Sequence, residues 1–164
     1  MWNDFNTAFE QAEYERKLPE GEYQGVIIGC SFTEAKEGTM RWFNLEMLVQ
    51  TADCPNHSEE IVKRELVGKI AKESLMVGKV VDGFMEPINM NLTVVKDIAR
   101  ATFGDITGMD MSTIVATLPQ SVVDTKISFA IEQNFSKKYD KKFRNFVFDS
   151  AHRTDALDEA KLPF

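Results

Sequence analysis

Apolar and polar residues alternate along two stretches of the chain, and each stretch predicts a β-hairpin. The first hairpin has strands over residues 22–32 and 40–51, separated by a polar turn that contains Gly38. Its second strand places Trp42 on the polar face and four apolar side chains on the other: Phe43, Leu45, Met47 and Val49. This strand is therefore expected to separate an apolar face from a polar one.

The first strand of this hairpin contains two glycines, Gly25 and Gly29, on one face. Glycines at these positions permit strong coiling or a β-bulge. The opposite face is expected to carry the larger side chains: Val26, Ile28, Cys30 and Phe32.

The second hairpin has strands over residues 126–135 and 143–149, with a lysine-rich turn over residues 136–142. Its last strand carries apolar residues on both faces: Phe143 and Val147 on one, Phe146 and Phe148 on the other. A barrel has one interior, so one set must be covered from outside. The cover could be the N-terminal arm, a second subunit or nucleic-acid bases, and the pattern does not decide which set faces inward.

Between the hairpins the pattern is less regular. Residues 59–75 fit either a helix or a pair of charged strands, and periodicity does not decide between them. Residues 77–85 predict one strand with glycines at its limits. Residues 105–124 are mixed, and Pro119 is interpreted as marking a connection.

One helix is predicted in this region. Asn89 to Asn91 are expected to cap it, and an apolar stripe continues to Phe103. Gly104 is expected to end it.

The order hairpin, strand, helix, hairpin is that of the OB-fold, a five-stranded Greek-key barrel. We therefore predict a mainly β protein, a β-barrel with one or two helices, in which residues 52–76 and 105–124 are insertions. The predicted organisation is an N-terminal arm or short helix, an OB-fold domain and a flexible acidic C-terminal tail: residues 1–17, 18–149 and 150–164.

Composition places the chain in the cytoplasm. Hydrophobic residues make up 43% of its 164 residues, which is enough for one core, and no apolar run reaches the 18 residues that a membrane-spanning helix needs. The first residues lack a basic start and an apolar stretch, so a secretory signal is not expected. Two cysteines, Cys30 and Cys54, form no disulfide framework.

Catalytic and metal-binding patterns are weak, and we predict no enzyme, no cofactor and no metal site. The chain has neither a nucleophile elbow nor a phosphate-binding loop. Cys54 and His57 have a spacing typical of metal ligands and Cys30 could join them, but a structural zinc needs a fourth ligand. A metal-dependent enzyme using Cys54 and His57 is a distant alternative.

The net charge of −7 weighs against a nucleic-acid partner, but its distribution does not. Residues 126–144 contain two acids and six bases: Lys126, Lys137, Lys138, Lys141, Lys142 and Arg144. Among them stand three aromatic residues: Phe135, Tyr139 and Phe143. Cations follow phosphates and aromatic rings stack on bases, so this mixture is typical of single-strand binding. The alternative is a lysine-rich turn that serves solubility.

Trp42, with Arg41 beside it, is a second candidate for base stacking, because a tryptophan on the outward face of a barrel strand suits it. Residues 38–42 would then form the rim of a groove. The alternative for Trp42 is packing beneath the N-terminal segment.

The chain ends in an acidic stretch followed by Leu162, Pro163 and Phe164. This ending resembles the C-terminus of bacterial single-stranded DNA-binding proteins, whose terminal Phe ring and carboxylate dock into pockets on replication and repair proteins. The segment from Leu18 to Tyr23 is similar to the start of the barrel in small phage-encoded proteins of that functional group. The resemblance implies an OB-fold, a single-stranded DNA ligand and partner binding through the tip.

These observations together predict a non-enzymatic, phage-encoded protein that coats single-stranded DNA in replication, recombination and repair. The alternative is a β-barrel adaptor that binds proteins and no nucleic acid. A homodimer, formed through the N-terminal arm or the tail, is left open.

Overall fold

The first predicted hairpin is confirmed in the computed structural model, which describes residues 17–153. Strand β1 spans Gly21–Ala35 and β2 spans Met40–Asp53. The four apolar residues of β2 predicted to share a face are all buried, whereas Trp42 lies on the other face and is half-exposed. The turn needs left-handed backbone at Lys36, Glu37 and Gly38, where φ is 49°, 56° and 85°.

The glycines of β1 lie at two irregularities of the β1–β2 pairing. The register shifts between Gln24 and Gly25 and again between Ile27 and Gly29, as expected for bulges. The shifts also change which residues face the core. Tyr23 and Ile27 are buried in the first half, whereas Cys30 and Phe32 pack against the core in the second.

The predicted apolar face of β1 is therefore wrong in its first half. Val26 and Ile28 are half-buried, and Ile27 between them is fully buried. The prediction assumed strict alternation, which a bulge interrupts.

Residues 59–75, predicted as either a helix or a pair of charged strands, contain one helix and the start of one strand. Helix α2 spans Glu59–Glu65, and strand β3 begins a short turn later and spans Ile70–Val81. The single strand predicted over residues 77–85 is wrong, because the chain reverses at Asp82 and Gly83. Both have positive φ, 51° and 82°, and β4 (Phe84–Pro87) returns along β3.

The predicted helix is confirmed as α3, Asn89–Phe103, and Gly104 ends it with a φ of 81°. The predicted asparagine cap is wrong, because the N-cap residue is Ile88 and it makes no side-chain cap. Asn91 instead donates its side-chain amide to the carbonyl of Met76 in β3, at 2.7 Å.

Helix α4, Met111–Ser121, was not predicted. Its start carries a recognisable signal, because Asp110 accepts hydrogen bonds from the backbone N–H and the hydroxyl of Thr113, both at 2.9 Å. These bonds hold the pKa of Asp110 below its ordinary value. Pro119 lies inside the helix rather than in a connection, so its interpretation as a break is wrong.

The second hairpin is confirmed as β5, Thr125–Ser136, and β6, Lys141–Arg153. Strand β6 continues past its predicted end at Asp149 because Ser150 to Arg153 pair with the start of β5. Phe146 and Phe148 pack against the core, whereas Val147 is 39% exposed on the other face. A stack of rings runs from Tyr23 through Phe129 to Phe146, with centroids 5.3 and 5.0 Å apart.

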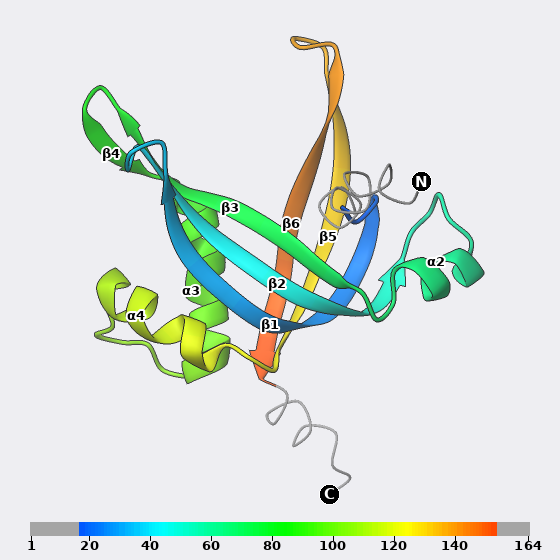
Figure 1. The fold of residues 1–164 in the computed structure, drawn as a ribbon, viewed down its shortest axis with the longest axis horizontal. Helices are drawn as coiled ribbons and strands as arrows, with labels where there is room; N and C mark the ends of the chain where they lie inside the picture. Colours follow the sequence, from blue (N-terminus) through cyan, green and yellow to red (C-terminus); the bar gives the residue numbers. More distant parts are fainter. Residues whose placement is uncertain (1–16, 154–164) are drawn as a thin grey trace, which may run out of the picture.

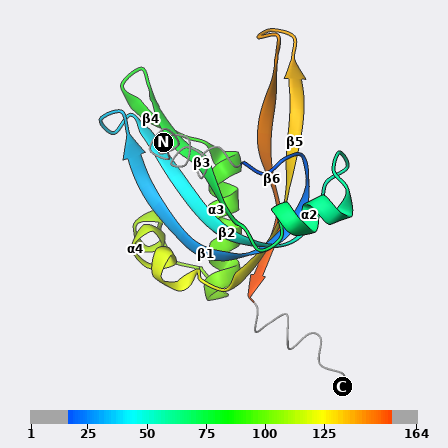
Figure 2. The same cartoon turned by 45° about the vertical axis from the view of Figure 1, so that its right-hand side comes forward.

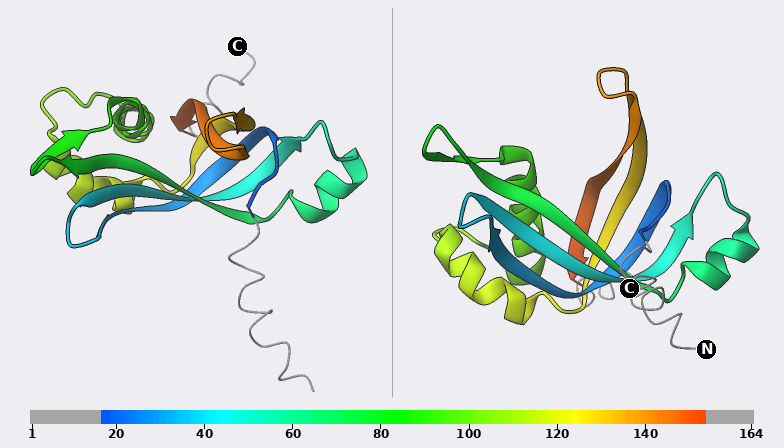
Figure 3. Two further views of the ribbon diagram at one scale, coloured as in Figure 1. Left: turned by 90° about the horizontal axis from the view of Figure 1, so that it is seen from above. Right: turned by 45° about the horizontal axis from the view of Figure 1, so that its top comes forward.

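The six strands form one antiparallel sheet in the order β4-β3-β2-β1-β5-β6, curled into a half-barrel (Figures 1 and 2). The protein is therefore mainly β, with three helices in the described part of the chain. Helix α3 packs against β6, β3 and β5, and α4 packs against β1 and α3. Seen from above, the curvature brings β6 and α3 to the same side of the first three strands (Figure 3).

The core lies inside the curl and is built from both hairpins, β3 and the two longer helices. Its fully buried side chains include Tyr23, Phe43, Ile98, Leu118 and Ile127. None of the helices within residues 17–153 is both long and apolar enough to cross a membrane.

Candidate nucleic-acid interface

The tip of the second hairpin stands clear of the rest of the sheet. Strand β1 pairs with β5 only as far as Ile131, so residues 132–145 form a two-stranded ribbon that projects beyond the sheet (Figure 1). We call this ribbon the arm. The turn at its end passes through Asp140, whose φ is 49°.

The predicted cations and rings of the arm lie together at its end. Phe135 and Tyr139 are 57% and 60% exposed, and four exposed lysines surround them: Lys137, Lys138, Lys141 and Lys142. The ring of Tyr139 makes an edge contact with that of Phe143, with centroids 5.9 Å apart, but both Phe135 and Tyr139 keep more than half of their surface exposed and open to a ligand.

The two faces of the arm carry different sets of side chains. Phe135 pairs with Lys142, and Asn134 pairs with Phe143, so Phe135 and Phe143 lie on opposite faces. The ammonium of Lys141 lies 4.9 Å from the ring centre of Phe143, and that of Lys138 lies 5.3 Å from the ring centre of Tyr139. These cation–π contacts place positive charge directly against the stacking surfaces.

Arg144, at the base of the arm, differs from the four exposed lysines because its guanidinium is held by hydrogen bonds within the fold. Its Nη1 donates to Glu73 Oε2 at 3.0 Å, its Nη2 donates to Glu73 Oε1, and its Nε donates to the carbonyl of Leu18 at 3.0 Å. The Glu73 side chain is 8% exposed and that of Arg144 is 22% exposed. This bidentate pair joins β6 to β3, two strands that share no backbone pairing.

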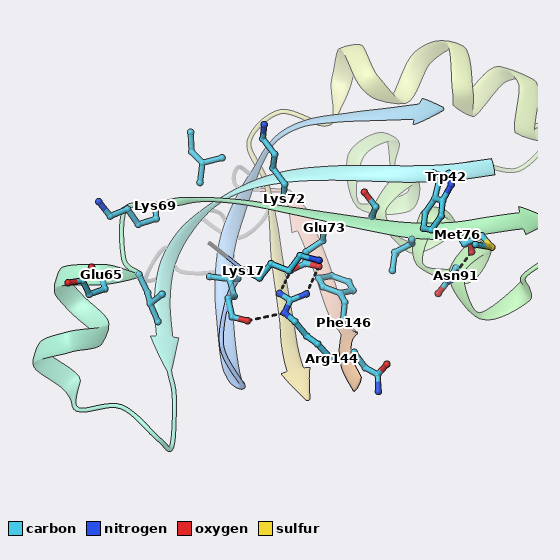
Figure 4. A pocket seen from close by; sticks show the side chains of 17 residues that line it. Lys17, Trp42, Glu65, Lys69, Lys72, Glu73, Met76, Asn91, Arg144 and Phe146 are labelled. Atoms are coloured by element: carbon cyan, nitrogen blue, oxygen red, sulfur yellow. Dashed lines mark hydrogen bonds and ion pairs between the residues drawn. The ribbon is translucent and has the colours of Figure 1, made fainter. Parts of the chain in front are cut away.

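Beside this ion pair lies a groove of about 1300 Å³, which we call the β3–β6 groove (Figure 4). Most of residues 65–76 line one side, and residues 144–146 of β6 line the other. Lys17, Leu18, Trp42 and Asn91 also contribute to the lining. Of residues 38–42, which the sequence predicted as the rim of a groove, Trp42 alone is among the groove lining, where it lies opposite Met76 on β3.

The sequence analysis missed the part that β3 contributes. Buried and exposed residues alternate along this strand: Ala71, Glu73 and Leu75 are buried, whereas Ile70, Lys72 and Ser74 are exposed. This period of two was present in the sequence, but the alternative of a helix over the same residues concealed it. Lys69 and Lys72 add cations to the groove lining.

Two other predicted residues lie apart from the arm. Arg41 pairs with Glu34 at 3.4 Å near the β1–β2 turn. Lys126 is the second residue of β5 and lies at the end of the strand opposite the arm. At the rise per residue of an extended strand, it is about 33 Å from Ser136. The arm and the groove are adjacent through Arg144, but Lys126 belongs to neither.

The surroundings of two titratable side chains, buried Tyr23 and half-buried Cys30, disfavour their ionised forms. Tyr23 donates its hydroxyl to the carbonyl of Pro19 at 2.6 Å and lies 3.2 Å from Cys54 Sγ, and burial with this contact raises its pKa. Burial raises the pKa of the Cys30 thiol to about 12, so Cys30 carries little thiolate at neutral pH. Within residues 17–153, no three His, Cys, Asp or Glu side chains gather as metal ligands would.

Comparison of the sequence with protein-family models and with curated proteins finds no match. The predicted partner-binding tip, Leu162 to Phe164, lies outside the described residues, as do the predicted N-terminal arm up to residue 16 and most of the predicted tail.

Proposed function

We propose that this protein binds single-stranded DNA without sequence specificity and coats it during phage replication, recombination and repair. The observation that carries the proposal is the arm, where four exposed lysines surround exposed aromatic rings on a ribbon that stands away from an otherwise acidic protein. Single-strand binding needs this combination of phosphate-neutralising cations and stacking rings.

The proposal includes an OB-type barrel whose first and last strands in the sheet do not pair to close it. Strands β3, β2, β1, β5 and β6 are adjacent in that order, and α3 lies between β3 and β5 in the chain, which supports this assignment. In a closed barrel β3 would pair with the last strand. Here the Glu73–Arg144 ion pair bridges those two strands instead.

In this proposal, DNA runs from the arm into the β3–β6 groove. Lys137, Lys138, Lys141 and Lys142 neutralise phosphates, and bases stack on Tyr139, Phe135 or Phe143. Trp42 then receives a base in the groove, where Lys69 and Lys72 lie nearby. Arg144 has a positioning role at the base of the arm, because the N–H groups of its guanidinium already bond Glu73 and the carbonyl of Leu18.

The remaining parts of the proposal are a cytoplasmic location and recruitment of replication or recombination proteins by the C-terminal tip. No enzymatic activity and no cofactor form part of it. The tip's role depends on the resemblance of Leu162, Pro163 and Phe164 to the corresponding residues of bacterial single-strand-binding proteins.

The experiment that tests the proposal is a titration of labelled oligonucleotides at several salt concentrations. Neutralising about six phosphates gives a slope of log affinity against log salt near −4 for single strands. A fourfold rise in salt should then weaken binding by roughly 10²–10³.

Duplex DNA of the same length is the control ligand, and it should bind more weakly. Equal affinity for duplex, or a flat salt dependence, contradicts the proposed interface. No binding to either ligand would favour the alternative of a protein adaptor.

A further inference from the structure

One edge of β3 has no strand partner where it borders the groove. Strand β2 pairs with the other edge, and β4 pairs with β3 only from Gly78 onward, so residues 70–76 have no strand partner on this side within the described part of the chain. The carbonyl of Val77 accepts a hydrogen bond from the backbone N–H of Ile88 at 3.0 Å. The carbonyl of Met76 on this edge is bonded by the Asn91 side chain. Exposed strand edges are normally covered, because they otherwise invite pairing with other chains.

The surface beside this edge is also partly apolar. Ile70 is 59% exposed, and Trp42 and Met76 form a half-buried cross-strand pair on the same wall. Together with the unpaired edge, these side chains form a surface that a further segment of polypeptide can cover.

The chain enters the described fold inside this groove. Lys17 and Leu18 both line it. Leu18 is 5% exposed, and its carbonyl accepts the 3.0 Å hydrogen bond from Arg144 Nε. The residues that precede Lys17 therefore begin at the groove, and their effective concentration there is high because they are part of the same chain.

The composition of residues 1–16 complements the groove. This segment has one base, Arg16, and four acids: Asp4, Glu10, Glu13 and Glu15. The exposed cations of the groove are Lys17, Lys69 and Lys72, of which Lys72 also pairs with Glu46 at 3.6 Å, and Glu65 is the exposed acid of the lining. The segment also carries four aromatic residues: Trp2, Phe5, Phe9 and Tyr14. Acids suit these lysines, and the rings suit the surface made by Ile70, Trp42 and Met76.

We infer that residues 1–16 of the same chain dock on the β3–β6 groove, with their aromatic side chains over Trp42 and their acids toward Lys69 and Lys72. The inference needs no DNA and does not depend on the proposed function. A second copy of the chain is the rival occupant, and the test distinguishes it.

Trp42 reports on this contact. The chain has two tryptophans, so Trp2→Phe leaves Trp42 as the one fluorophore of its kind. In that full-length background, Glu10, Glu13 and Glu15 are changed to Lys, and acrylamide quenching of Trp42 is measured without nucleic acid. We expect the quenching constant to rise about twofold, because one face of the indole ring loses its cover.

The matched control changes Glu59, Glu60 and Glu86 to Lys in the same background, an equal change in charge on exposed residues that do not line the groove. It should leave quenching unchanged. Phe5→Ala with Phe9→Ala should raise quenching as the charge reversal does. Unchanged quenching in both segment variants overturns the inference, and so does quenching that falls as protein concentration rises, which would identify a second copy as the cover.

Discussion

Arg144 is one of six bases in residues 126–144, but its role in the fold differs from that of the exposed lysines. Its guanidinium is held by the carboxylate of Glu73, whose side chain is 8% exposed and which lies 71 residues earlier in the chain. The pair satisfies two charges that would each be costly if buried alone. At the scale of the residue, one basic side chain of the hairpin, Arg144, therefore serves structure, whereas the four lysines of the tip remain exposed to a ligand.

Removal of Glu73 should be strongly destabilising. We expect Glu73→Ala to lower the free energy of unfolding by about 3 kcal/mol, because it leaves Arg144 partly buried without its carboxylate. Unfolding in urea measures this change. Glu46→Ala is the control, since the Glu46–Lys72 pair at 3.6 Å is exposed, and its loss should cost less than about 1 kcal/mol.

A double variant separates charge pairing from packing. Glu73→Leu combined with Arg144→Met should recover much of the lost stability, because an apolar pair needs no compensating charge. If the single Glu73→Ala variant unfolds like the wild type, the ion pair does not hold β3 and β6 together.

At the scale of the element, β1 depends on its two bulges. Gly25 is the tighter position, because an added Cβ would lie 2.6 Å from the carbonyl oxygen of Leu48 on β2. At Gly29 the nearest atom would be the Glu46 carboxylate, 4.0 Å away. The backbone of Leu48 cannot move aside as the flexible Glu46 side chain can, so a larger residue should be tolerated at position 29 but not at position 25.

Gly25→Ala should lower the free energy of unfolding by about 1–3 kcal/mol, the usual cost of overpacking. Gly29→Ala, in the same strand, should change it by no more than about 0.5 kcal/mol. Urea unfolding of both variants gives the comparison. Equal effects would mean that close approach to Leu48 is not what requires glycine at position 25.

At the scale of the whole molecule, the net charge of −7 is unevenly distributed. Residues 126–144 contribute +4 to an otherwise acidic chain, and the arm carries the exposed part of that charge away from the sheet. An anionic polymer would be attracted to the arm and repelled by much of the remaining surface. Binding by such a protein should be confined to one region and sensitive to salt.

Replacing Lys137, Lys138, Lys141 and Lys142 with Ala should therefore flatten the salt dependence of oligonucleotide binding. Four lost phosphate contacts reduce the magnitude of the slope by about 2.8 for single strands. Titrations at several salt concentrations measure the slope of each variant.

The control for this variant removes four exposed cations from the helices instead: Lys63, Arg64, Lys96 and Arg100. It changes the net charge equally and should leave the slope within about one unit of the wild type. Equal flattening by both variants would assign the effect to net charge rather than to the arm.

Both hairpins, α3 with its stop at Gly104, and the lysine-rich, aromatic turn of the second hairpin could be predicted from the sequence alone. Each of these depends on alternation, helical spacing or a turn, which are properties of neighbouring residues. The Asp110 cap was equally local, but the interpretation of Pro119 as a break concealed α4.

Only the tertiary structure decided the partner of Arg144, the inward face of β6, the unpaired edge of β3 and the groove beside it. These depend on how far the sheet curls and on which distant strands the curl brings together. Glu73 and Lys72 are neighbours in the chain, and the fold buries one against Arg144 while it leaves the other open to solvent. The alternation along β3 places the two side chains on opposite faces, but contacts between residues far apart in sequence decide which face is buried and that Arg144 is the partner.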